Sequence, residues 1–327
     1  MFSKNNLKIL IFSIIFATFG FILGKNTQNN AFVFSEIRNK GKYQFINPLL
    51  ECDSVSFSSN IALDSLKNKL SSLISSLESS HQLNLVSIYY RDLNNGPWLG
   101  INEKEDFSPA SLIKVPLLIT YYKAAESNPD LLKQTLIYTP KKNELVQDII
   151  PSVTLIPDKP YTIEELIREM IVYSDNDAYE LLLNNIDNQL LVNTYQDLGV
   201  DLSNAFVNPN GNIIPVKSYA AFFRVLFNAS YLNNEMSEKA LRLLSEVQYE
   251  NALVKGINDP NIKIAHKFGE RTFTDTGEKQ LHDCGIVYFP QKPYLICVMT
   301  RGTDFTNLAS AIAQISQTIY QEISKNP

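Results

Sequence analysis

Three short clusters in this chain of 327 residues combine side chains that can carry chemistry. The first is in the stretch SPASLIKVPLL, where Ser111 and Lys114 are three residues apart and, on a helix, share one face. A serine becomes a nucleophile when a base lies beside its hydroxyl, and a lysine is such a base once burial or neighbouring cations lower its pKa. The spacing alone is common, and a surface lysine next to a helix cap is its ordinary explanation.

The second cluster is Ser174-Asp175-Asn176, which lies between two helical patterns. Serine, aspartate and asparagine are ordinary helix caps, so capping alone explains this cluster. It also offers a hydroxyl and an amide on a rigid turn, and these groups suit proton relay and the binding of an acyl-amide substrate.

The third cluster is Lys267-Phe268-Gly269, within the strand pattern IKIAHKFGERTF. A glycine two residues after a lysine allows a substrate backbone to approach the strand closely. A lysine at a strand edge followed by a bulge glycine is the alternative for this cluster taken alone.

The elements that must position these clusters follow from the spacing of apolar residues. We predict helices over 61–79, 109–127, 162–173, 177–185, 188–198, 216–229, 237–247 and 307–323, and strands over 83–93, 97–103, 262–268, 284–289 and 294–300. This order predicts an α/β (α+β) fold, in which helices flank an antiparallel sheet and an all-helical subdomain, approximately residues 127–250, is inserted.

Composition narrows the function classes. The net charge is −5, and 45% hydrophobic with 19% charged residues is typical of a globular protein. Nothing suggests nucleic-acid binding, which usually needs a strong basic patch. The cysteines, Cys52, Cys284 and Cys297, form no CxxC motif and no Cys/His cluster, so the sequence predicts neither a metal nor another cofactor.

Two of the cysteines fall on one predicted hairpin, residues 284–299. With a turn at 290–293, Cys284 and Cys297 are diagonal neighbours on adjacent strands. Diagonal pairs are usually too far apart for a good disulfide. We therefore predict that both are free, buried thiols.

The N-terminal residues 9–24 are apolar and uncharged, and Lys8 and Lys25 flank them. A basic lead before such a run is typical of a secretory signal or a signal anchor, and the lack of a small-x-small motif before Lys25 favours an uncleaved anchor. A cleaved signal and a buried core helix are the alternatives. The positively charged end of a membrane segment usually stays in the cytoplasm, so we predict that the catalytic domain lies outside the cytoplasm. The chain then consists of a membrane segment over 1–24, a tether over 25–60 and the catalytic domain over 61–327.

The three clusters can be written as the motifs SxxK (Ser111 to Lys114), SDN (Ser174 to Asn176) and K-x-G (Lys267 to Gly269). In this order they resemble the motifs of the penicillin-recognising serine enzymes. The chain is similar to class A β-lactamases over the whole predicted catalytic domain. The resemblance implies that Ser111 is the acylated nucleophile and Lys114 its base. It also implies that Ser174 passes a proton to the leaving nitrogen and that Asn176 holds the substrate's side-chain amide. Lys267, a further catalytic residue by this resemblance, sets the local charge and helps to bind the substrate carboxylate.

The resemblance further implies an oxyanion hole made by the backbone N–H groups of Ser111 and Glu270. Gly269 and Arg271 are then substrate-binding residues beside it.

The third cluster departs from the family pattern at Phe268, which lacks the hydroxyl with which family members bind the substrate carboxylate. Thr272, Thr274 and Arg271 are the candidates to replace that hydroxyl.

A second departure concerns deacylation. Class A β-lactamases use a loop glutamate to activate the water that clears the acyl-enzyme, but no Asp or Glu occurs between Asp201 and Glu235. Asn208 and Asn210 are poor general bases, and Glu180 needs a different geometry. The residues therefore support acylation but not fast hydrolysis.

Three functions remain open at this point. The first is a β-lactamase-like serine hydrolase that acts on β-lactams with slow deacylation. The second is a membrane-anchored penicillin-binding D-Ala-D-Ala carboxypeptidase or related peptidase, with the same acyl-serine chemistry. The third is a catalytically weak module that binds cell-wall peptide, although a binding module needs no nucleophile–base pair.

Overall fold

The computed structural model describes residues 31–38, 41–57, 61–80, 83–94, 97–140, 147–200 and 211–325. The predicted membrane segment, Asn208 and Asn210 lie outside these ranges. Among the residues described, no helix has both the length and the apolar character that crossing a bilayer requires.

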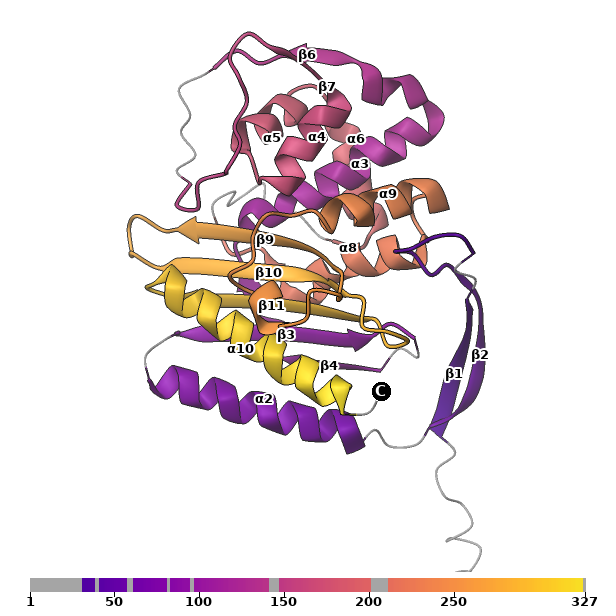
Figure 1. Ribbon diagram of the computed structural model, residues 1–327, viewed down its shortest axis with the longest axis vertical. Coiled ribbons are helices and arrows are strands. Elements are labelled where there is room, and N and C mark those ends of the chain that lie inside the picture. The colour runs from indigo at the N-terminus through magenta and orange to yellow at the C-terminus, as the bar shows by residue number, and fades with distance from the viewer. Residues whose placement is uncertain are drawn as a thin grey trace, which may run out of the picture.

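A five-stranded antiparallel sheet forms the centre of the molecule (Figure 1). Its strands, in spatial order, are β4 (Trp98–Ile101), β3 (Leu85–Asp92), β11 (Tyr294–Gly302), β10 (Lys279–Val287) and β9 (Ile264–Thr272). Strands from the two ends of the catalytic domain meet where β3 pairs with β11. The predicted antiparallel sheet is confirmed, and β9 with the third cluster forms one edge of it.

Helices cover both faces of this sheet. In Figure 1, α2 (Ile61–Ser79) and α10 (Phe305–Ser324) lie on one face and α8 (Val216–Asn228) on the other. Of the six apolar residues at helical spacing that predicted α2, four are buried, namely Leu66, Leu70, Ile74 and Leu77, and Leu63 and Leu73 are partly buried. Because both faces are covered, β10 and β11 are buried along almost their whole length.

The segment between β4 and β9 builds the predicted helical part, above the sheet in Figure 1. Its helices are α3 (Lys114–Ser127), α4 (Ile163–Val172), α5 (Asn176–Leu183), α6 (Asn188–Asp197), α8 and α9 (Asn234–Leu244). Short turns and strands connect them: β5 (Asp106–Phe107), η1 (Ala110–Ile113), η2 (Pro129–Lys133), β6 (Thr135–Ile137), β7 (Pro160–Thr162), β8 (Ile214–Pro215) and η3 (Val254–Gly256). Thr162 and Glu165 form the capping box that starts α4. The fold class is thus confirmed.

A buried carboxylate fixes the chain between β1 (Ala31–Arg38) and β2 (Leu49–Phe57), which pair antiparallel. Glu238 on α9 accepts hydrogen bonds from the backbone N–H groups of residues 44–46, at 2.8 to 3.0 Å. Charge-assisted bonds of this kind are among the stronger hydrogen bonds. This part of the predicted tether is therefore docked on the helical part, whereas the limits of the tether stay a prediction.

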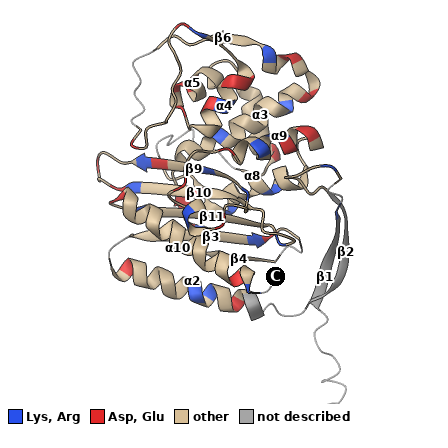
Figure 2. Ribbon diagram, in the orientation of Figure 1, with Lys and Arg blue, Asp and Glu red and all other residues tan. Residues whose placement is uncertain are grey.

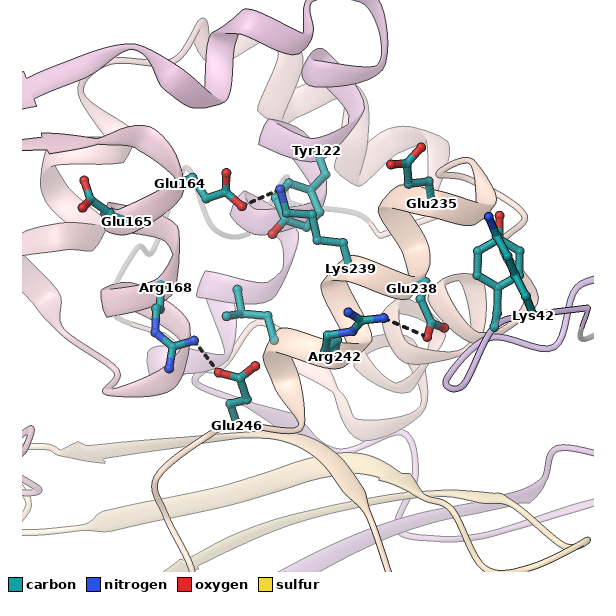
Figure 3. A pocket seen from close by; sticks show the side chains of 12 residues that line it. Lys42, Tyr122, Glu164, Glu165, Arg168, Glu235, Glu238, Lys239, Arg242 and Glu246 are labelled. Carbon is teal, nitrogen blue, oxygen red and sulfur yellow. Dashed lines mark hydrogen bonds and ion pairs between the residues drawn. The ribbon is translucent and has the colours of Figure 1, made fainter.

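A hollow of about 680 Å³ lies between residues 42–43, α4 and α9 (Figure 3). Six of the charged side chains that line it form three ion pairs: Lys239–Glu164, Arg168–Glu246 and Arg242–Glu238. None of the three sequence clusters lines this hollow, so we assign no catalytic role to it.

Charges of both signs are interspersed over the part of the chain that the structure describes (Figure 2). On α9, for example, Glu235 and Glu238 lie next to Lys239 and Arg242. This mixing of charges agrees with the small net charge of −5 of the whole chain.

The prediction of free thiols on the hairpin is wrong. Cys284 and Cys297 lie directly opposite each other in β10 and β11 and form a disulfide. Val287 and Tyr294 are the last paired residues of the hairpin, so its loop covers 288–293. The pairing of the two strands is therefore shifted by two residues from the pairing expected with a turn at 290–293. That difference turns a diagonal pair into a facing pair.

We expect the disulfide to resist alkylation in denaturant until a reductant is added, when both cysteines should be labelled. Replacing both by alanine, Cys284→Ala with Cys297→Ala, should lower the free energy of unfolding by about 3 kcal/mol, because the bond closes a loop with a sequence separation of 13. Urea unfolding of the oxidised protein and of the double variant measures the loss. Full labelling without reductant would show that the bond is not formed.

Candidate active site

Ser111 lies in the 3₁₀ turn η1, which leads directly into α3. The turn begins with Ala110 at a φ of 48°, a left-handed conformation that costs a residue with a side chain about 1–3 kcal/mol. Leu112 is buried, and its carbonyl oxygen accepts a hydrogen bond of 3.1 Å from the hydroxyl of Tyr219 on α8. The core thereby holds the turn while the Ser111 side chain stays partly exposed.

Gly269 on β9 allows this turn to lie against the edge of the sheet. A Cβ atom at position 269 would come within 3.0 Å of the backbone nitrogens of Ser111 and Leu112. The sequence suggested that glycine here admits a substrate backbone. The backbone that approaches is that of the chain itself, and it brings Ser111 to the edge strand.

The Lys114 amine lies inside the protein, with 1% of the side chain exposed. Its Nζ donates to the Ser174 carbonyl oxygen and to Asn176 Oδ1, both at 2.7 Å, and lies 3.3 Å from Ser174 Oγ. In the described part of the chain, the Ser111 hydroxyl takes part in no hydrogen bond. The first and second clusters, 60 residues apart in sequence, thus meet at one nitrogen atom.

Burial lowers the pKa of Lys114 to about 7, against the opposing effect of the charges on Asp175 and Glu270. A neutral amine has two N–H groups and one lone pair. The two short hydrogen bonds use the N–H groups, so a neutral Nζ keeps its lone pair. A buried lysine amine with a pKa near neutrality can take up a proton at neutral pH, and the role of Lys114 as the base of Ser111 stays a prediction.

The Ser174 hydroxyl lies between two buried lysines. Lys267 Nζ donates to Ser174 Oγ and to the Phe268 carbonyl oxygen, each at 2.9 Å. Lys267 is fully buried, and burial, together with the positive charge of Lys114, lowers its pKa well below the usual value. A hydroxyl that bridges two amines can accept a proton from one side and donate one to the other.

Local sequence places Ser174 by ending one helix and starting the next. Asp175 caps α5, since its carboxylate accepts the Ala178 N–H at 2.6 Å. Ser174 itself has a φ of 59°, which turns the chain sharply between α4 and α5. Capping accounts for Asp175, but the oxygens of Ser174 and Asn176 are used by Lys114 instead.

Residues 65–323 match the family model described as the Beta-lactamase enzyme family, which covers most of the chain. The chain belongs to this family. Its predicted class, a serine hydrolase of the β-lactamase family, is therefore confirmed. Among curated proteins, none matches the chain.

Solved structures show the same fold for this β-lactamase family member. A β-lactamase from Chitinophaga pinensis is 19% identical with a TM-score of 0.67, over 79% of this chain and 99% of its own. PBP-A, in a mutant acyl-enzyme complex with penicillin G, is 20% identical with a TM-score of 0.64, over 80% and 97%. A class A β-lactamase from Mycobacterium abscessus is 20% identical with a TM-score of 0.63, over 80% and 99%.

In this family member an aromatic ring covers the third cluster. Phe268 stacks on Tyr249, with 4.1 Å between the ring centroids, and Lys267 Nζ lies 4.2 Å from the Phe268 centroid. The ring thus helps to bury Lys267, which is the main cause of its lowered pKa. No pattern in the sequence pointed to Tyr249, because its contact with Phe268 is made only in the folded chain.

The three candidates to replace the missing hydroxyl have different surroundings. Thr272 Oγ1 donates to Asp148 Oδ2 at 2.7 Å, and Arg271 Nη1 donates to Ser108 Oγ at 3.3 Å. Thr274 is exposed. Thr272 and Arg271 therefore bind other groups of the chain, and a role of any of the three toward a substrate stays a prediction.

A segment that sequence analysis missed, residues 147–149, connects the second cluster to β9. The Gln147 side chain donates to the Ser174 carbonyl oxygen at 3.2 Å. The next two backbone N–H groups donate to Glu270 Oε1, at 2.9 and 3.2 Å. The two contacts with Glu270 join residues about 120 positions apart, and that of Gln147 with Ser174 joins residues 27 apart, so no local sequence pattern predicts them.

Proposed function

We propose that this protein is acylated at Ser111 by β-lactams and related acyl compounds and that it releases the acyl group slowly. The observation that carries this proposal is the Ser174 hydroxyl held between Lys114 and Lys267, beside a nucleophile without a hydrogen-bond partner in the described residues. The PBP-A relative in its acyl-enzyme complex with penicillin G supports it, since it shares the fold.

In the proposed acylation, neutral Lys114 takes the proton of Ser111 as Oγ attacks the substrate carbonyl. The negative charge on the carbonyl oxygen faces the backbone N–H groups of Ser111 and Glu270. Ser174 then gives its proton to the leaving nitrogen and regains one from Lys114. The C–N bond breaks, the Ser111 ester forms, and Lys114 returns to the neutral state.

We expect slow release of the acyl group because the chain has no carboxylate in the segment where class A β-lactamases carry the general base for water. No Asp or Glu occurs between Asp201 and Glu235, where the resemblance would require a general base for water. This absence also favours the second candidate function, a penicillin-binding peptidase, for which a β-lactam is a long-lived inhibitor. A module that only binds cell-wall peptide would form no adduct.

We expect the protein, mixed with a chromogenic β-lactam, to release one equivalent of product in a burst before a slow steady rate. Acylation has its general base in place, whereas deacylation lacks the carboxylate, so the second step limits turnover. Stopped-flow absorbance measures the burst, and intact-mass spectrometry follows the adduct. Linear hydrolysis from the first turnover, at the rate of an efficient enzyme, would contradict slow deacylation; the absence of any adduct would contradict acylation.

We further propose that residues 9–24 anchor the protein in the cytoplasmic membrane, with the catalytic domain outside. The apolar run flanked by Lys8 and Lys25 supports this, and so does the disulfide, because disulfides persist mainly in oxidising compartments. Protease added to intact spheroplasts should digest the catalytic domain. Complete protection in spheroplasts, with digestion after lysis, would overturn the proposal.

A further inference from the structure

The turn that carries Ser111 rests on one face of the sheet, at β9 and β10. Gly269 on β9 packs against the backbone nitrogen of Ser111. His282 on β10 lies directly opposite Gly269, and Gln280 is two residues earlier on the same face of β10. Two buried polar side chains of β10 therefore lie under the start of this turn.

Ser108, three residues before Ser111, is held at both of its backbone polar groups. Its N–H group donates to Gln280 Oε1 at 3.0 Å, and its carbonyl oxygen accepts from His282 Nε2, also at 3.0 Å. All three residues of this arrangement are fully buried. A buried backbone group that loses its partner is costly, so these two side chains fix the position of Ser108. We call Gln280 and His282 the Ser108 clamp.

The His282 ring keeps one orientation and one protonation state. A carbonyl oxygen only accepts, so Nε2 carries the proton in the bond to Ser108. The other ring nitrogen, Nδ1, accepts the Thr300 backbone N–H at 3.3 Å. Burial lowers the pKa of His282 to about 3. The ring is therefore neutral over the range in which Lys114, with a pKa of about 7, takes up its proton.

The two residues between Ser108 and Ser111 have little conformational freedom. The ring of Pro109 restricts its φ, which is −63°. Ala110 has a φ of 48°, a conformation that a residue with a side chain keeps only where its surroundings impose it. With Ser108 held and Pro109 rigid, Ala110 cannot relax to a negative φ unless Ser111 moves. The clamp thus acts on Ser111 through Ala110.

We propose that Gln280 and His282 are positioning residues for the acylation of Ser111, on which this inference rests. They hold Ser108 in place, and Ala110 therefore keeps its left-handed conformation. Ser111 is then presented to the substrate carbonyl in one orientation, with its backbone N–H group in the oxyanion hole.

The first test compares His282→Leu with His282→Gln. Leucine offers no donor to the Ser108 carbonyl oxygen, whereas glutamine has an N–H group at about the position of Nε2. At saturating penicillin G, we expect His282→Leu to acylate ~10- to 100-fold more slowly than the wild type, and His282→Gln to stay within about threefold of it. The penicillin concentration at half-maximal rate should change little, because the groups that bind the substrate are still present. Timed quenching and intact-mass spectrometry measure both quantities.

A second substitution tests whether the effect passes through Ala110. Glycine adopts a positive φ without strain, so Ala110→Gly removes the tendency of the turn to relax when the clamp is lost. In the Ala110→Gly protein, His282→Leu should therefore slow acylation by only about threefold. If His282 contributed to packing alone, the loss would be the same with alanine and with glycine at position 110, and the positioning role would be overturned.

Gln280→Met tests the other half of the clamp, because it removes the acceptor of the Ser108 N–H group. It should slow acylation by roughly tenfold. This variant also keeps the inference testable if His282→Leu does not fold.

Ser316→Ala is the control for a general loss of stability. It removes a buried hydrogen bond outside the clamp, between the Ser316 hydroxyl and the Leu253 carbonyl oxygen. It should lower the midpoint of thermal unfolding and keep the wild-type rate of acylation.

The outcomes separate this inference from the proposed function. Wild-type rates in both His282→Leu and Gln280→Met, with the wild type acylated normally, overturn the clamp alone. The same result follows if Ser316→Ala slows acylation as much as His282→Leu does. No adduct on the wild type overturns the proposed acylation, and the inference falls with it.

Discussion

Replacing Ser111 with alanine should abolish covalent labelling by penicillin G, because the acyl bond goes to that hydroxyl. The Ser111 hydroxyl is partly exposed and makes no hydrogen bond in the described part of the structure, so its loss should change the free energy of unfolding by less than about 0.5 kcal/mol. Intact-mass spectrometry after incubation with excess penicillin measures the adduct. The variant should show the unmodified mass at every time point.

The matched control is Ser127→Ala, at the exposed C-terminal end of α3, the helix that follows the Ser111 turn. It should be labelled at the wild-type rate. An adduct on Ser111→Ala that forms as fast as on the wild type would place the nucleophile elsewhere and would remove the basis of the proposed mechanism.

Replacing Lys114 with methionine should slow acylation by ~100- to 10,000-fold, the usual contribution of a general base. Methionine fills most of the buried volume, whereas alanine would leave a cavity. The substitution also leaves the Ser174 carbonyl oxygen and Asn176 Oδ1 without their lysine donor. Pre-steady-state rates with a chromogenic β-lactam measure the loss, and thermal unfolding reports on the fold. A variant that acylates at the wild-type rate would exclude Lys114 as the base.

The pH profile distinguishes a lost base from a distorted site. The base is the neutral amine, and burial lowers the pKa of Lys114 to about 7. Acylation by the wild type should therefore fall about tenfold per pH unit below pH 7 and level off above it. Lys114→Met should lose this dependence. Lys123→Met, on the exposed face of the same helix, removes a lysine that pairs with Glu126 and should keep both the rate and the profile.

By itself, the sequence determined the three clusters and the order and type of the main helices and sheet strands from residue 61 on, whereas β1 and β2 fall in the segment predicted as a tether. Apolar periodicity, the capping box at Thr162 and the spacing of Ser111 from Lys114 are local features, since each depends on residues within a few positions along the chain. For that reason, a five-stranded antiparallel sheet with an inserted helical part was predictable. The family was also predictable from the sequence, because its motifs are short and occur in a fixed order.

Only the tertiary structure decided which atoms meet. Lys114 finds its partners in Ser174 and Asn176, and Glu270 binds a segment 122 positions away. The hairpin register was likewise undetermined, because a loop of 288–293 and a turn of 290–293 fit the same strand pattern. Since strand side chains alternate, a shift of two residues keeps every side chain on its face. The apolar pattern therefore does not distinguish the two registers, and the packing of β10 between β9 and β11 brings Cys284 opposite Cys297.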